Sequence, residues 1–152
     1  MPSHSENRRV PYSARQMYDL VADVERYPEF LPWTVAARIR DTHHEDSHVV
    51  MLADLVVSFK VFSERFGSRV TLWPEANRIS TEYLDGPFRR MNSDWQFADA
   101  EEGGSDVSFH VDFEFRNRLL QTTARLFFNE VTQRVVHAFE RRAADLYGAG
   151  SG

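Results

Sequence analysis

The chain has 152 residues, of which 42% are hydrophobic and 27% charged. These values fit one globular domain, which we expect to span 1–152 with its core at about 8–147. The absence of cysteine excludes disulfides, thiol catalysis and thiolate metal sites, and the formal net charge of −5 disfavours nonspecific binding to nucleic acid. No run approaches the roughly 18 apolar residues of a membrane span, and the N-terminus lacks an apolar signal core, so we expect a soluble cytoplasmic protein that is at most peripheral at the inner membrane.

A helix is predicted near the N-terminus because its start signals are complete. Ser13 and Gln16 form a capping box, S-x-x-Q, in which each side chain satisfies an amide at the helix start. We expect the helix to end near Tyr27, because Pro28 follows. Its buried face is defined by apolar residues at helical spacing (Met17, Leu20, Val21 and Val24).

The segment from Tyr27 to Trp33, YPEFLPW, has two prolines and four large apolar side chains in seven residues. It is too rich in proline for a regular strand and too apolar for a solvated loop, which favours a short helical turn and connector pinned onto an apolar surface. Two interpretations stay open. The segment is a lid whose Phe30, Leu31 and Trp33 contact a ligand or a membrane, or these side chains seal the core.

From residue 35 to residue 116 the pattern is that of β-strands. Turn signals at 41–48, at Pro74, at 85–87 and at 101–105 help to delimit six predicted strands. Consecutive strands without intervening helices predict an antiparallel meander. The strands are expected at about 35–39, 49–59, 62–72, 79–83, 91–97 and 107–115, and the last alternates most regularly (Val107, Phe109, Val111, Phe113 and Phe115 on one face).

The remainder of the chain is predicted to be one helix of about 30 residues, or about 45 Å at about 1.5 Å per residue. Asn117 is a suitable N-cap and Gly148 a suitable C-terminal stop. The apolar stripe of this helix comprises Leu120, Ala124, Phe127, Val131, Val135, Ala138 and Phe139. The predicted fold is therefore α+β, of helix-grip type: a curved antiparallel sheet around a long C-terminal helix, with short N-terminal helices.

A single helix cannot fill the space above the apolar face of such a sheet, so we expect an apolar cavity. Glu64 shares a strand face with apolar residues. It is either a polar handle for a ligand head group, the partner of an ion pair with Arg125 or Arg134, or turned outward by a bulge. Trp95 is expected to wall the cavity and to present its indole N–H to a ligand carbonyl. The expected ligand-binding residues are Phe30, Leu31, Trp33, Phe62, Glu64, Phe66, Met91, Trp95, Phe127 and Val131.

Residues that could carry metal binding or catalysis do not form a convincing pattern. His43, His44 and His48 lie in a polar turn, where neighbouring histidines rarely converge on one ion. His110 and His137 have no predictable nucleophile or carboxylate partner, so a catalytic triad is unsupported. We therefore expect no metal, no catalytic residue and no required cofactor.

Residues 11–33, PYSARQMYDLVADVERYPEFLPW, resemble the coenzyme Q-binding, START-like family of the polyketide cyclase and lipid transport superfamily. Shorter similarities follow in the same order at 64–70, 84–88, 95–97, 113–115 and 128–131, so that the resemblance covers about residues 10–145. It implies a START-like helix grip with an apolar tunnel, and binding of ubiquinone in support of respiration without catalysis. Thr34 stands where many relatives carry cysteine, which leaves the tunnel unaffected.

Three functional hypotheses follow. The first is a noncatalytic binder or chaperone of a polyprenyl quinone, with ubiquinone as bound ligand, transient contact with a membrane surface through residues 27–33, and no DNA partner. The second rests on the resemblance alone, because the family includes a ribosome association toxin: inhibition of ribosomal subunit joining, with the large subunit as partner. The third is a polyketide aromatase or cyclase, for which only Glu64, Ser68 and Ser93 offer polar groups.

Overall fold

A computed structural model describes residues 3–59 and 62–148, except for the side chains at positions 59, 62, 124 and 127–129. Within these ranges, seven strands, two α-helices and a short 3-10 helix follow one another. In chain order they are β1 (Ser3–Val10), α1 (Ala14–Ala22), η1 (Val24–Glu29), β2 (Thr34–His44), β3 (Val49–Phe59), β4 (Phe62–Trp73), β5 (Arg78–Asp85), β6 (Phe88–Asp99), β7 (Ser105–Phe115) and α2 (Arg118–Tyr147).

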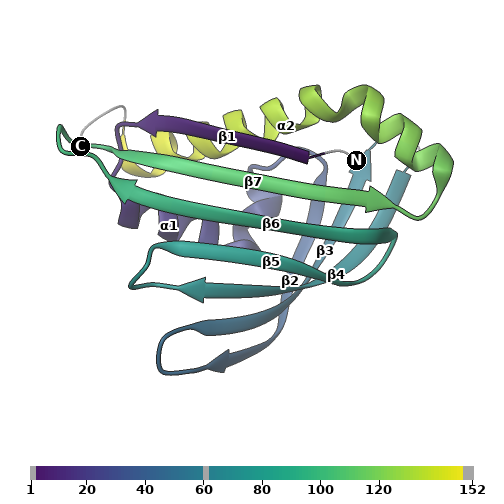
Figure 1. Ribbon diagram of the computed structural model, residues 1–152, viewed down its shortest axis with the longest axis horizontal. Coiled ribbons are helices and arrows are strands. Elements are labelled where there is room, and N and C mark those ends of the chain that lie inside the picture. Colours follow the sequence, from purple (N-terminus) through teal and green to yellow (C-terminus); the bar gives the residue numbers. More distant parts are fainter. Residues whose placement is uncertain (1–2, 60–61, 149–152) are drawn as a thin grey trace.

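The described strands form one antiparallel sheet in the order β1-β7-β6-β5-β4-β3-β2. From β2 to β7 each strand pairs with the next along the chain, which is the meander that the sequence predicts. Figure 1 shows that the sheet is curved and that α2 runs along its length, with α1 near one end. The predicted α+β helix-grip fold is confirmed.

The strand β1 departs from the sequence-based expectation, which has no element before Ser13. It pairs with β7 at the edge of the sheet, from Ser3 opposite Asp112 to Val10 opposite Ser105. Before the buried Val10 at its end, its less exposed side chains are polar (His4, Glu6 and Arg8), so most of the strand lacks the apolar alternation by which strands are recognised. Inward-pointing charged side chains are a known protection of edge strands against pairing with other chains.

The strand β2 continues to His44, so the turn predicted at 41–48 is shorter than expected. The backbone N–H of Glu45 donates to the carbonyl of His48 at 2.8 Å and closes the β2–β3 hairpin. A register shift follows Ile39 and breaks the alternation of side chains along β2. The polar second half of the strand could therefore not be recognised from its pattern.

The capping box at the start of α1 is formed as predicted. Ser13 Oγ accepts the N–H of Gln16 at 3.1 Å, and Gln16 Oε1 accepts the N–H of Ser13 at 2.9 Å. The helix expected to run to Tyr27 is divided, because α1 ends at Ala22 and η1 follows. Pro28 lies inside η1, where the missing N–H of proline cannot continue an α-helical hydrogen-bond ladder.

The long helix α2 lies between its two predicted caps. Asn117 Oδ1 accepts the N–H groups of Leu119 and Leu120 at 2.8 and 3.2 Å, and Gly148 follows the last turn. Among the described side chains of α2, the inward stripe is rotated relative to the predicted one and shares Phe139 with it. The predicted members Ala124 and Phe127 lie outside the described side chains, and the buried members are Thr132, Val136, Phe139 and Ala143. No helix in the described ranges is long and apolar enough to cross a membrane.

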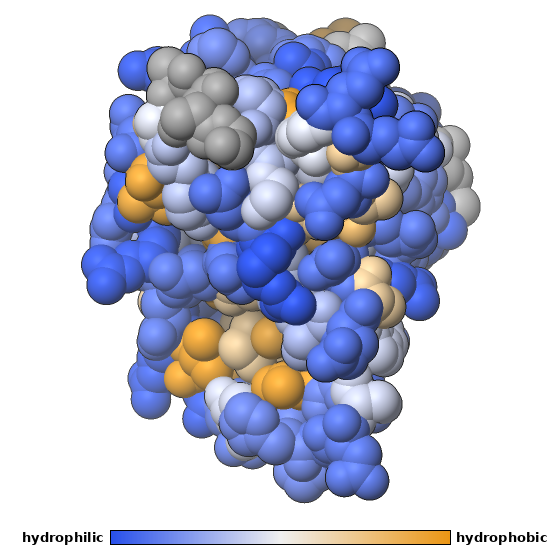
Figure 2. Space-filling model, turned by 90° about the vertical axis from the view of Figure 1, so that its left-hand side faces the viewer, coloured by the Kyte–Doolittle hydropathy of each residue, from blue (hydrophilic) through white to orange (hydrophobic). Residues whose placement is uncertain are grey.

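The packed core lies where α1 and the second half of α2 meet the sheet. α1 contacts β5, β6, β7 and α2, and the buried side chains come from all of these layers. Figure 2 views the molecule from this end and shows a mostly polar surface, with apolar residues gathered in its lower half. The residues buried most completely include Ala14, Met17, Val21, Ala53, Ile79 and Ala143.

Candidate functional site

The inner face of the sheet, across which α2 runs, has a closely packed part around Trp95. This side chain is 9% exposed. Its ring stacks on Phe97 with centroids 6.0 Å apart, lies 4.3 Å from the centroid of Phe109, and meets Phe139 of α2 edge to face at 5.2 Å. Aromatic rings pack against Trp95 on three sides, where β6, β7 and α2 meet. We therefore assign Trp95 to the packed core rather than to the wall of a cavity.

A second group of aromatic side chains lies on the same face, at the end of the sheet from which α2 starts. Phe88 is its centre: its ring stacks on Phe115 at 4.6 Å and meets Phe66 and Phe113 edge to face at 5.3 and 6.0 Å. Met91 lies directly opposite Phe113 in the pairing of β6 with β7. All five side chains are only half-buried. We call these five residues the aromatic floor.

Local geometry places Phe88 in this group. It follows a turn in which Gly86 has φ +139°, a conformation that residues other than glycine rarely adopt. A Cβ atom at Gly86 would lie 2.7 Å from the Cβ of Phe66, so only glycine lets the turn approach the floor this closely. The N–H of Phe88 donates to the hydroxyl of Tyr83 at 3.1 Å, which fixes the first residue of β6.

The Tyr83 hydroxyl is a polar group within this apolar environment. Tyr83 is half-buried, lies opposite the buried Ser68 in the pairing of β4 with β5, and places its ring 5.4 Å from that of Phe88. Because its oxygen accepts the Phe88 N–H, its own proton is left to donate to another acceptor. A carbonyl oxygen of a ligand on the floor is such an acceptor.

Glu64 lies on the predicted face of β4 and is exposed. β4 pairs with β3 without a bulge at this point, so Glu64 shares a face with the buried Ser68. The ion pair with Arg125 or Arg134 is not formed among the described residues, and Arg134 pairs instead with Glu130 at 3.4 Å. Glu64 therefore lies at the solvent edge of the face that carries the floor.

The segment 27–33 packs against α2. Tyr27 donates its hydroxyl to the carbonyl of Val21 at 2.5 Å, and its ring meets Phe139 edge to face at 5.6 Å. Phe30 meets Phe139 in the same way at 5.3 Å. Burial raises the pKa of the Tyr27 phenol well above its usual range. The first part of the segment is thus fixed to the core, while Phe30 and Leu31 remain half-buried.

Trp33 ends this segment in an unusual backbone conformation. Its φ is +65°, in the left-handed region that residues other than glycine seldom occupy. Its carbonyl accepts the N–H of Ser58 at 2.8 Å, and the guanidinium carbon of Arg134 lies 6.0 Å from the centroid of its ring. Strained backbone positions of this kind gather at functional sites.

A cleft of about 690 Å³ separates this segment from α2. Among the predicted ligand-binding residues whose side chains the structure describes, Phe30 alone lines it. Its other lining residues are Glu29, Pro32, Gln133, Arg134, His137, Ala138, Arg141, Arg142 and Asp145. The cleft is therefore distinct from the aromatic floor, and we call it the η1–α2 cleft.

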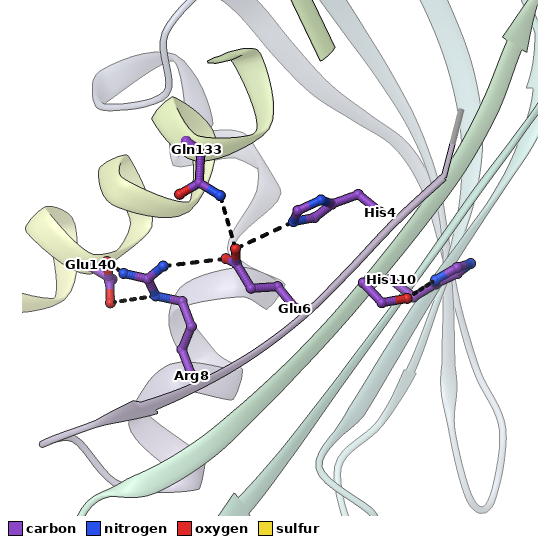
Figure 3. Close-up of polar contacts among 7 residues, drawn as sticks. His4, Glu6, Arg8, His110, Gln133 and Glu140 are labelled. Carbon is purple, nitrogen blue, oxygen red and sulfur yellow. Dashed lines mark hydrogen bonds and ion pairs between the residues drawn. The ribbon is translucent and has the colours of Figure 1, made fainter. Parts of the chain in front are cut away.

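On its other side α2 is joined to β1 by a polar cluster (Figure 3). Gln133 Nε2 donates to Glu6 Oε1 at 3.1 Å, and His4 Nε2 lies 3.4 Å from the same oxygen. Arg8 donates through Nε and Nη2 to both carboxylate oxygens of Glu140, at 3.1 and 3.0 Å. One side of α2 is thus held to the sheet edge by hydrogen bonds and ion pairs, and the other by aromatic packing.

The predicted ligand-binding residues are distributed among these regions. Phe66 and Met91 belong to the floor, Trp95 to the packed core, and Val131 is half-buried on α2. The side chains of Phe62 and Phe127 lie outside the described part of the structure. Three members of the floor (Phe88, Phe113 and Phe115) were not among the predicted site residues, although the alternation along β7 already placed the last two on one inward face.

Polar residues outside these regions form pairs rather than a reactive centre. Ser5 Oγ lies 2.6 Å from His110 Nδ1 across β1 and β7, and both residues are exposed. His43 Nε2 lies 2.6 Å from Glu45 Oε1 at the β2–β3 hairpin. Within the described residues, the structure brings together no group of three histidine, aspartate or glutamate side chains able to hold a metal ion.

Comparison with known proteins decides the family. The family described as polyketide cyclase / dehydrase and lipid transport matches residues 10–140 of the chain. The chain belongs to this family. The match extends from the end of β1 into the second half of α2, so it includes the aromatic floor and much of the η1–α2 cleft.

Members of the family with curated names are similar over nearly the whole chain. The ribosome association toxin RatA of Escherichia coli (strain K12) is 37% identical over 149 residues, which cover 98% of this chain and 91% of RatA. The mitochondrial coenzyme Q-binding protein COQ10 homolog B of Xenopus laevis is 33% identical over 149 residues, which cover 95% of this chain and 59% of that protein.

A solved structure of the same fold comes from Caulobacter crescentus. The solution structure of an 18 kDa protein from this organism superposes with a TM-score of 0.82 at 30% sequence identity, and covers 98% of this chain and 100% of that protein. The family placement and the START-like resemblance predicted from residues 11–33 are therefore confirmed.

Proposed function

We propose that this protein is a noncatalytic carrier of an apolar ligand of the polyprenyl quinone type, such as ubiquinone, and that the ligand lies on the aromatic floor beneath the first half of α2. The observation that carries the proposal is the floor itself. Five large apolar side chains point to the inner face of the sheet and yet remain half-buried. Apolar surface left accessible inside a fold favours an apolar ligand, at about 0.8 kcal/mol for each buried CH₂ group.

The Tyr83 hydroxyl gives the proposal chemical specificity. A quinone head group is planar and carries two carbonyl oxygens, so it can stack on the rings of Phe88 and Phe115 while one oxygen accepts the Tyr83 proton. The name of the Xenopus laevis relative, coenzyme Q-binding protein, supports a ligand of this class. Support of respiratory electron transport would follow from delivery of such a ligand.

A role at the ribosome is the second candidate, and the RatA relatives support it. The similarity to Escherichia coli RatA covers nearly the whole chain, and its identity of 37% is slightly higher than the 33% of the coenzyme Q-binding relative. In this proposal the protein would bind the large ribosomal subunit and inhibit subunit joining.

A polyketide aromatase or cyclase is favoured least, although the family description includes cyclases. Such an enzyme needs polar groups along its ligand site. Of the three considered, Ser68 is 2% exposed and belongs to the packed interior, and Glu64 is exposed at the edge of the face. Ser93 alone is half-buried on β6. One hydroxyl group without a partner base offers little for acid–base catalysis.

Ligand binding is tested by titrating the purified protein with a short-tailed ubiquinone and monitoring the tryptophan fluorescence. Native mass spectrometry of protein from a quinone-producing host, with lipid extraction, is expected to show quinone below one molecule per chain. Tyr83→Phe is expected to weaken binding about five- to tenfold, which corresponds to one hydrogen bond of about 1 kcal/mol. Tyr18→Phe, the same change in the packed core, should bind as the unaltered protein does.

Phe88→Ala removes the centre of the floor. We expect it to abolish measurable binding and to cost less stability than the roughly 3–5 kcal/mol typical of a fully buried aromatic side chain. Absence of quinone from the extracts, together with no binding of the short-tailed compound, would contradict the carrier proposal. Equal affinities for Tyr83→Phe and Tyr18→Phe would place the head group elsewhere.

A further inference from the structure

The η1–α2 cleft is basic, although the whole chain is acidic. Its lining includes the guanidinium groups of Arg134, Arg141 and Arg142, against the two carboxylates of Glu29 and Asp145. The net charge of the chain is −5. A local excess of positive charge on an acidic protein indicates a site for an anionic partner.

Two of these arginines are available to such a partner. Arg142 is committed to Glu29, to which it donates at 2.8 Å. Arg134 is 62% exposed and its contact with Glu130, at 3.4 Å, joins two exposed side chains four residues apart on the helix. Arg141 is exposed and has no ion pair within the described residues. Exchange of a weak surface ion pair for a bound anion costs little.

The opposite wall of the cleft is largely apolar. Phe30 and Pro32 form its apolar part, beside the carboxylate of Glu29, and Arg142 lies over the Phe30 ring with its guanidinium carbon 5.1 Å from the centroid. Arg134 is held in the same way over Trp33 at 6.0 Å. A guanidinium stacked on a ring keeps its N–H groups at the edge free to donate to phosphate oxygens.

The basic side chains continue an apolar row on the solvent side of α2. Leu119 and Leu126 are each 75% exposed, the largest exposure among the large apolar residues of the described chain. Leu119, Leu126, Arg134, His137 and Arg141 follow one another at intervals of seven, eight, three and four residues, which places them on one side of an α-helix, together with the exposed Glu130 that pairs with Arg134. Exposed leucines beside arginines are typical of helices that lie in a membrane interface.

We propose that this side of α2, together with the η1–α2 cleft, docks on an anionic lipid bilayer. The phosphate of a lipid head group enters the cleft between Arg134 and Arg141, and Leu119 and Leu126 enter the boundary of the acyl chains. The exposed leucines favour a bilayer over a nucleic acid as the anionic partner, because a phosphate backbone offers them no apolar contact. The proposal goes beyond ligand carriage, and it uses residues that take no part in the aromatic floor.

The test is sedimentation of ligand-free protein with vesicles, either of phosphatidylcholine alone or of phosphatidylcholine mixed with phosphatidylglycerol. We expect clear preference for the mixed vesicles. Arg134→Gln and Arg141→Gln should each lower the affinity about fivefold, the effect of one basic residue near an anionic surface. The control is Arg69→Gln, which makes the same change of charge on the outer face of β4, where Arg69 pairs with Glu82 at 2.9 Å. It should leave the affinity unchanged.

Two further arms distinguish a bilayer from other sources of phosphate. Leu126→Gln should weaken vesicle binding, whereas inorganic phosphate and a single-stranded RNA oligonucleotide should bind the unaltered protein weakly. Equal losses of vesicle affinity for Arg141→Gln and Arg69→Gln would overturn the proposal, because any basic residue of the surface would then contribute equally. Tighter binding of RNA or of inorganic phosphate than of mixed vesicles would also overturn it. Because no quinone is present, failure here is independent of the carrier proposal.

Discussion

The ring of Trp95 on β6 meets the ring of Phe139 on α2 edge to face, with centroids 5.2 Å apart. This contact joins the sheet to the second half of the long helix. Phe139 also contacts the rings of Tyr27 and Phe30 edge to face. The helix is therefore fixed at this position between the sheet and the segment 27–33. The first half of α2 is tied to β7 by Gln121, whose Oε1 accepts the N–H of Phe115 at 2.7 Å.

Trp95→Ala is expected to destabilise the fold by about 3–5 kcal/mol, because it removes a packed aromatic side chain rather than the wall of an open cavity. The affinity for a short-tailed quinone, per folded molecule, should stay unchanged. Urea unfolding and a quinone titration on the same sample measure the two quantities. A small loss of stability with a large loss of affinity would return Trp95 to the ligand site.

The example of Trp95 shows how far sequence patterns could locate the site. Alternation along a strand fixes which face a side chain points to, and the pattern of β7 placed Phe109, Phe113 and Phe115 correctly on one face. It does not say which of them α2 covers closely. That depends on how the helix crosses the sheet, so Trp95 and Phe88, on one strand, have different surroundings.

Two other departures have similar physical causes. The strand β1 is evident from its pairing with β7 but could not be predicted from its own residues. The side chains that it turns toward α2 are polar: His4, Glu6 and Arg8. The η1–α2 cleft joins residues about 100 positions apart in the sequence. By contrast, the ends of α2 and the capping box of Ser13 and Gln16 were predictable, because caps act within one helical turn.

Trp33 offers a test of backbone strain. Trp33→Gly relieves the left-handed conformation at φ +65°, whereas Trp33→Ala loses the same ring and keeps the strain. We expect the glycine variant to be more stable than the alanine variant by about 1 kcal/mol. Trp73 is the control, because it lies in the regular strand β4 with Arg78 over its ring at 4.8 Å. There the order should reverse, and the same order at both positions would show that strain at Trp33 is negligible.

The buried phenol of Tyr27 predicts a loss of stability at alkaline pH. Its pKa is raised above the usual 10.0, first by burial and second by the charge of Asp23. The folded state therefore holds its proton more tightly than the unfolded state, and stability should be unaffected below about pH 10 and fall as the pH rises further. Unfolding free energies between neutral and alkaline pH measure the slope. Tyr27→Phe should make it less steep, and an unchanged slope would assign the effect to other tyrosines.

The ion pair between Arg8 and Glu140 predicts how β1 is held to α2. Two hydrogen bonds of 3.1 and 3.0 Å in a fixed fork, with both side chains partly buried, make this pair stronger than ordinary surface pairs. We expect a double-mutant cycle with Arg8→Ala and Glu140→Ala to give a coupling energy of about 1 kcal/mol. Hydrogen exchange of the β1 amides should rise in either single variant, because this strand has only one partner strand.

The adjacent residue provides the matched comparison for that cycle. Arg9 faces the other side of β1 and pairs with Asp106 at 2.6 Å, but both side chains are more than half exposed. Arg9 lowers the pKa of the Asp106 carboxyl through its hydrogen bond, yet water screens this pair, so we expect no measurable coupling from it. Equal coupling for the two pairs would mean that the contact with α2 adds nothing to the attachment of β1. Loss of the Arg8 pair without faster exchange in β1 would lead to the same conclusion, because the β1–β7 hydrogen bonds would then suffice to hold the strand.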